Sequence, residues 1–289
     1  MSKKIIISAL AAVAAISAGS AAAAPSVDKY NVSQSVFNPT YRPAQGDWGV
    51  QAGFNFQTGS NDDFSSQTKF STGEFQVGDF RAVYGIMDEL FVSLDVYSNT
   101  FNPYVGNFYN GKFANPEIGL NWQIVRPAKS FAVDLIGKYG AAWTRDAVTN
   151  DRIGMNNLQA GLRIYGDEGM FQWGAQSLAQ LGFRPAGVIS DSDRMWNLLS
   201  RVEAEFEIVK KVGLRGEFNF NVYNLDRNSG ELTFYDMNTT LGLIYDLAPG
   251  AAIQPYVAYH LRTSHSGGIG GAPLPNDFWQ FGAKVGVQF

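Results

Sequence analysis

Apolar and polar residues alternate along most of the chain from residue 46 onward, with the period of two that is typical of β-strands with unlike faces. In segment 118–124, for example, Ile, Leu, Trp and Ile alternate with Gly, Asn and Gln. We predict a strand in each of the twelve segments that show this pattern: 47–57, 74–86, 90–97, 116–125, 130–143, 156–165, 170–180, 195–208, 212–223, 233–245, 252–262 and 278–289.

The connections between these segments alternate in length. Short connections cover 87–89, 126–129, 166–169, 209–211 and 246–251, whereas long polar ones lie near 58–73, 98–115, 144–155, 181–194, 224–232 and 263–277. Tight turns at one rim and long loops at the other, with an even number of strands, indicate a membrane-spanning barrel. A soluble β-sandwich also alternates, but nothing in it segregates loop lengths so regularly. The predicted fold is all-β, an antiparallel up-and-down β-barrel of 12 strands that spans a membrane.

Segment 192–208 also fits a helix, because apolar residues recur in it with helical spacing. Its second half nevertheless alternates strictly, with Val, Ala, Phe and Ile between Arg and Glu residues. A helix here would leave eleven strands and break the alternation of loop lengths. We therefore predict a strand.

The first 45 residues lack the alternation. Residues 1–23 have two lysines near their start, Lys3 and Lys4, followed by an apolar run from Ile5 to Ile16 and then by small residues. This order predicts a secretory signal peptide. Residues 24–45 show no sustained period and indicate an extended arm. This arm either hangs in the periplasm or folds into the barrel mouth as a plug, and residues 46–289 form the barrel.

Composition narrows the partners only slightly. The chain has no cysteine and a formal net charge of -4, and removal of Lys3 and Lys4 with the signal makes this about -6. An acidic protein is an unsuitable partner for nucleic acid. After the signal, no stretch has the 18 or so uninterrupted apolar residues of a transmembrane helix.

Charged residues occupy the strand face that should line the lumen. We set the lipid-facing residues that flank each short turn opposite each other, 86 with 90, 124 with 131, 208 with 212 and 245 with 253. Four hairpins then bring opposite charges together, and a fifth places an arginine opposite a glutamine: Arg81 with Asp95, Glu117 with Lys138, Glu205 with Arg215, Asp236 with Arg262, and Arg163 with Gln172. Charge sign was not used to choose these registers, so it supports them. A solvated face of a soluble sheet would also pair its charges.

The predicted lumen wall is therefore polar and mixed in sign. Its candidate selectivity residues are Arg81, Asp95, Glu117, Lys138, Arg163, Arg201, Glu203, Glu205, Arg215, Glu217, Asp236, His260, Arg262 and Lys284. A twelve-stranded barrel lies between one filled by its side chains and one with a wide channel, so the lumen is either a narrow pore or mostly plugged. Because most of these charges find partners, we expect weak ion selectivity.

An enzyme is a competing class, but its candidate residues are few. The only histidines are His260, on the lumen parity, and His265, in a Ser- and Gly-rich stretch. A serine next to a histidine on extended backbone is no catalytic pair, because adjacent side chains diverge. We predict no enzymatic activity, no cofactor and no metal site.

The last predicted strand carries a family resemblance. Its apolar residues alternate up to an aromatic residue at the end of the chain: Trp279, Phe281, Val285, Val287 and Phe289. This pattern resembles the C-terminal strand of Gram-negative outer-membrane β-barrel proteins, where a terminal Phe is the assembly signal. Segments 84–90 and 115–122 are also similar to parts of such barrels. The resemblance implies an outer-membrane location, contact with outer-membrane lipid and lipopolysaccharide, and insertion by the barrel-assembly machinery.

The expected function is a porin-like channel for passive passage of small hydrophilic solutes. The alternatives are a closed barrel with a structural or surface-interaction role and, less favoured, an outer-membrane hydrolase. The sequence leaves the solute and the oligomeric state open.

Overall fold

The computed structural model describes residues 35–58, 74–96, 116–125, 131–142, 152–153, 155–184, 188–189, 192–227, 230–266 and 277–289. The predicted signal peptide and the first part of the arm lie outside these ranges. The described residues form fourteen strands: β1 (Trp48–Thr58), β2 (Glu74–Met87), β3 (Leu90–Val96), β4 (Glu117–Val125), β5 (Ala132–Gly140), β6 (Arg152–Ile153), β7 (Asn156–Asp167), β8 (Phe171–Phe183), β9 (Val188–Ile189), β10 (Ser192–Val209), β11 (Val212–Arg227), β12 (Gly230–Ala248), β13 (Ala251–Ser266) and β14 (Asp277–Gln288).

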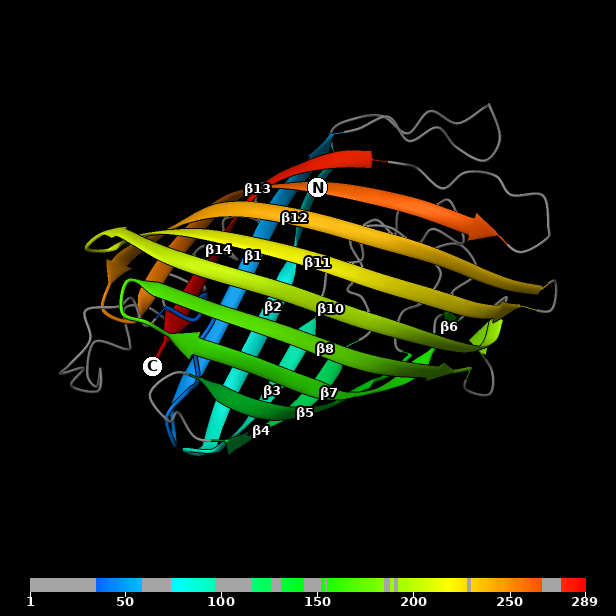
Figure 1. Ribbon diagram of the computed structural model, residues 1–289, viewed down its shortest axis with the longest axis horizontal. Coiled ribbons are helices and arrows are strands. Elements are labelled where there is room, and N and C mark those ends of the chain that lie inside the picture. Colours follow the sequence, from blue (N-terminus) through cyan, green and yellow to red (C-terminus); the bar gives the residue numbers. More distant parts are fainter. Residues whose placement is uncertain are drawn as a thin grey trace.

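Twelve of these strands close into one antiparallel barrel (Figure 1). The ring is completed by β1 and β14, which pair over ten residues from Gly49↔Gln288 to Thr58↔Trp279. The predicted fold and strand number are confirmed, as is the strand over 192–208, which forms most of β10. The two short strands β6 and β9 pair with each other in parallel outside the barrel. Among the described residues, no helix is long and apolar enough to cross a membrane.

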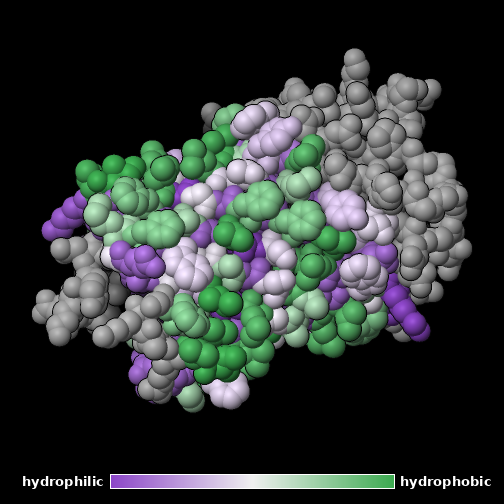
Figure 2. Space-filling model, in the orientation of Figure 1, coloured by the Kyte–Doolittle hydropathy of each residue, from purple (hydrophilic) through white to green (hydrophobic). Residues whose placement is uncertain are grey.

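The outer surface of the barrel is apolar. Large hydrophobic side chains are strongly exposed on it, among them Ile118 (62%), Trp122 (52%) and Leu181 (62%). Figure 2 shows hydrophobic residues gathered over the barrel strands. Exposed apolar area costs about 25 cal/mol per Å² in water, so a belt of this extent belongs in lipid. A closed sheet also leaves no unpaired edge, as hydrocarbon requires. The chain is therefore a membrane-spanning barrel of the outer-membrane type.

Three of the five predicted hairpin registers are observed. The strand pairing sets Arg81 opposite Asp95, Glu205 opposite Arg215, and Asp236 opposite Arg262. In each of these hairpins a β-bulge lies next to the short turn, and the pairing beyond it follows the prediction. Positive φ angles at Lys211 (75°) and Gly250 (75°) make the chain reversals tight.

Two predicted registers are wrong. Lys138 faces Gly119 and not Glu117. The pairing of β4 and β5 begins at Val125 and Val133 instead of 124 and 131, and after the bulge between Gln123 and Val125 it stays two residues from the predicted register. Arg163 faces Gln176 and not Gln172, a shift of four residues. In this second hairpin β7 continues to Asp167, into the segment expected to form the turn. The chain then reverses tightly at Gly169, which has a φ of 79°.

Candidate functional site: the lumen and its N-terminal arm

The N-terminal arm, here residues 35–47, enters the barrel at the rim of short turns. The amide of Gly46 donates to the carbonyl of Gly85 at 2.8 Å, and the amide of Gly85 donates to Asp47 at 3.0 Å. A Cβ on Gly85 would stand 1.9 Å from the Ala44 carbonyl oxygen. Only a glycine allows the arm this close to β2.

The middle of the arm is held by the wall that β5, β7 and β8 form. The guanidinium of Arg42 contacts the Asp134 carboxylate at 2.6 Å. The hydroxyl of Thr40 donates to Gln172 at 3.0 Å, and Arg163 donates to the carbonyl of Pro39. Asp134 is fully covered, so this ion pair is shielded from water.

The start of the arm reaches the opposite wall. Phe37 is 2% exposed and packs against Ile244 of β12 and Ala252 of β13. On β14, a Cβ at Gly286 would lie 2.2 Å from Val36 and 3.0 Å from Phe37, so the arm fills the space that a side chain would need. Arg215 of β11 donates to the Phe37 carbonyl. The arm thus crosses the lumen near the short-turn rim.

The arm makes its own turns. The Asn38 amide donates to Ser35 at 2.9 Å, and the Tyr41 amide donates to Asn38 at 3.0 Å. The Asn38 side chain accepts from the backbone amide of Thr40 at 2.8 Å, as in an Asx-turn. Burial, and then the nearby Asp47 carboxylate, raise the pKa of Tyr41 well above its usual range. Its hydroxyl therefore stays neutral in this position.

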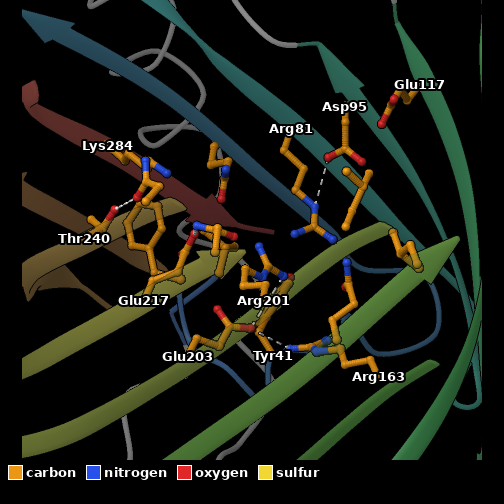
Figure 3. Close-up of a pocket in the computed structure, with 18 of the residues that line it drawn as sticks. Tyr41, Arg81, Asp95, Glu117, Arg163, Arg201, Glu203, Glu217, Thr240 and Lys284 are labelled. Atoms are coloured by element: carbon orange, nitrogen blue, oxygen red, sulfur yellow. Dashed lines mark hydrogen bonds and ion pairs between the residues drawn. The ribbon is translucent and has the colours of Figure 1, made fainter. Parts of the chain in front are cut away.

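Glu203 of β10 is the centre of one charge cluster in the described part of the lumen. Its carboxylate pairs with Arg215, and lies 3.6 Å from Arg201 and 3.8 Å from Arg163. Figure 3 shows Arg163 and Arg201 beside it. Arg215 also contacts Glu217, at 3.3 Å. The two arginines that bind the arm carbonyls, Arg163 and Arg215, are called the clamp arginines below.

A second cluster forms around Asp95 of β3. Its carboxylate pairs with Arg81 at 3.3 Å and with Lys138 at 2.9 Å. The partner predicted for Lys138, Glu117, instead accepts a hydrogen bond from Gln159 at 2.7 Å. The register shift of β4 against β5 explains this exchange, because it moves Lys138 away from Glu117 along the wall.

Glu205 behaves differently from its register partner. It lies opposite Arg215 in the sheet, yet that guanidinium turns to Glu203 and Glu217. Glu205 is 3% exposed, and its Oε2 makes no hydrogen bond. The predicted pairing of the strands at Glu205 and Arg215 is confirmed, but the two side chains do not form the ion pair that this pairing suggested.

The remaining predicted lumen residues come from β12, β13 and β14. His260 contacts the amide side chains of Asn238, at 2.7 Å, and Gln280, at 3.1 Å. The Lys284 ammonium lies 5.4 Å from the centre of the Tyr256 ring, a cation–π distance. Lys284 faces Gly53 across the closing seam, between Gln51 and Asn55.

Above the arm the lumen holds a cavity of about 660 Å³. Val36, Phe37, Asn38 and Tyr41 of the arm contribute to its lining, with charged and amide side chains from the barrel wall. The lining includes twelve of the fourteen predicted lumen residues: Arg81, Asp95, Glu117, Lys138, Arg163, Arg201, Glu203, Arg215, Glu217, Asp236, His260 and Lys284. Glu205 lies below it, near the turn between β10 and β11.

Sequence reasoning missed the contact surface for the arm. Several lumen-parity residues near the short-turn rim are apolar and buried: Val83, Phe91, Ala132 and Ile244. Arg42 of the arm lies over the Phe91 ring, 5.1 Å from its centre. A water-filled lumen does not need apolar residues at these positions, so their presence in the sequence was a signal that something packs there.

No known protein family matches the sequence, and no curated protein matches it. Its fold is similar to that of solved outer-membrane channels. An outer-membrane channel from Pseudomonas putida F1 matches with a TM-score of 0.54 at 10% identity, over 89% of this chain and 100% of that one. The NanC porin gives 0.49 at 9% identity over 82% and 98%, and the KdgM porin 0.42 at 10% over 82% and 97%. The first of these supports the outer-membrane barrel fold.

Proposed function

We propose that the protein is a narrow passive channel for small hydrophilic solutes. The observation that carries this proposal is the polar cavity of about 660 Å³ inside a closed barrel with an apolar outer belt. A polar cavity of this size favours passage of a hydrophilic solute. In a barrel with a purely structural role, packed apolar side chains would fill the lumen. The similarity in fold to outer-membrane channels agrees with this function.

The arm sets the width of the proposed channel. It crosses the lumen from Arg163 of β7 on one wall to Arg215, Ile244 and Gly286 on the other. A solute that enters from the long-loop rim meets this crossing before the short-turn rim. We therefore expect a small unitary conductance.

The same crossing favours one alternative, a barrel that the arm keeps closed. The two functions differ in a direct measurement. Full-length mature protein, refolded and shown to be heat-modifiable on gels, is inserted into planar lipid bilayers. Discrete conductance steps support the channel, whereas their absence from a folded preparation contradicts it.

Deletion of residues 24–42 completes this experiment. If steps are absent in the full chain but present after the deletion, the barrel is closed by its arm. If neither form conducts, the lumen is closed by its own side chains, and a structural role is the better description.

A further inference from the structure

The ion pairs of the lumen expose their two members unequally. Arg81 is 31% exposed while its partner Asp95 is 4% exposed. Arg201 is 27% exposed while Glu203 is 4% exposed. In both pairs the carboxylate is covered and the guanidinium faces the cavity. At these two pairs a solute in the cavity therefore meets the cation, although each pair has no net charge.

These two arginines, called the cavity arginines, come from opposite sides of the barrel. Arg81 lies on β2 and Arg201 on β10, which five other strands separate along one side of the ring. Both line the same cavity, and Arg201 interacts electrostatically with Asp95, the partner of Arg81. Figure 3 shows the two side chains extending toward the middle of the cavity. They can thus bind one solute from two directions.

The clamp arginines do not compete for such a solute. Arg163 is 8% exposed and Arg215 is 10% exposed, and both use donors on the arm carbonyls. Among the acids, Glu217 is 18% exposed, and it accepts from Asn219 at 2.8 Å as well as from Arg215. The donors directed into the cavity are therefore mainly those of Arg81 and Arg201.

From this asymmetry we infer that the cavity arginines form a binding site for a small oxyanion, either a carboxylate or a phosphate. The inference rests on the proposed channel and gives its solute class. A guanidinium offers paired N–H donors that match both anions. Buried acids hold the arginines in place without reaching the solute themselves. The channel should then select anions, and more strongly than the weak ion selectivity that the sequence predicts from paired charges.

The variants Arg81→Gln and Arg201→Gln test the site without leaving an acid unpaired. Asp95 keeps Lys138 at 2.9 Å, and Glu203 keeps both clamp arginines. Arg194→Gln is the matched control, because Arg194 lies on the same strand as Arg201 with opposite parity, is exposed, and does not line the cavity.

Full-length mature protein is measured in bilayers, first in a KCl gradient and then with succinate or inorganic phosphate added as a blocker of chloride current. We expect a reversal potential that favours chloride. Each cavity variant should raise the half-blocking concentration about tenfold, the effect of losing one charge-assisted hydrogen bond. Arg194→Gln should match the native chain. The stronger of the two blockers identifies the anion.

Two results overturn the inference while the channel stands: native pores without anion preference, or cavity variants that behave like Arg194→Gln. If the folded barrel does not conduct, the channel fails, and the site is tested separately by titration calorimetry of the full chain with succinate and phosphate. Absence of heat in both titrations then overturns the site as well.

Discussion

At the scale of single residues, the lumen arginines differ in role although they share one chemistry. Arg163 and Arg215 are covered and bind main-chain carbonyls of the arm, while Arg81 and Arg201 face the cavity. A guanidinium carries five N–H donors, so a clamp arginine can bind a carbonyl and a carboxylate together. The residue that joins the two groups is Glu203, which contacts both clamp arginines and Arg201.

Replacement of Glu203 by glutamine should therefore destabilise the folded barrel by about 3 kcal/mol, because it leaves buried guanidinium groups without their counter-charge. Glu205→Gln is the matched control, since Glu205 lies on the same strand and face, is equally buried, and has an oxygen without a hydrogen bond. Loss of the Glu205 charge should lower the free energy of unfolding by less than about 1 kcal/mol. Urea unfolding of both variants in detergent, followed by the shift in gel mobility, measures the difference. Equal losses would contradict the central role of Glu203.

At the scale of elements, the strands could be predicted and the arm could not. Lipid on one side and a polar lumen on the other impose a strict period of two, which even resolved the helix-like segment 192–208. Registers were predictable where a bulge beside the turn restored the expected pairing, as at Arg81 and Asp95. Between β4 and β5 the pairing begins at Val125 and Val133, and a similar bulge leaves it two residues from the expected register. Apolar and polar residues do not alternate in the arm, because successive residues of the arm contact different parts of the barrel wall. Its position depends on Ile244, Gly286 and the clamp arginines, which are distant in sequence.

The arm can be displaced by one substitution on the wall. Gly286→Val places a side chain where Val36 and Phe37 now lie, and should loosen the arm and raise the conductance. Gly216→Val is the control, because a Cβ there meets nothing within 4 Å, and the strand tolerates a β-branched residue. Single-channel recording of both variants tests the effect, with protease cleavage of the arm as a second readout. Identical conductance and cleavage in the two variants would show that the arm does not depend on Gly286.

At the scale of the whole molecule, the barrel exists only when its first and last strands meet. The amide of Trp48 donates to the Phe289 carbonyl at 2.7 Å, and the amide of Phe289 donates to Trp48 at 2.9 Å. The side chains of Trp279, Phe281 and Phe289 are 48%, 48% and 41% exposed toward the lipid, whereas Val287 is 4% exposed. The terminal ring therefore adds little to packing within the chain, and its proposed role is recognition during assembly.

Phe289→Ala separates these two contributions, because it removes the ring and keeps both backbone hydrogen bonds of the seam. If the ring serves recognition by the assembly machinery, the folded fraction in outer membranes should fall severalfold in cells, while refolding of the purified chain in detergent should remain close to that of the native chain. Gln288→Ala, on the lumen parity of the same strand, should change neither. An equal fall in cells and in detergent would instead assign Phe289 to stability.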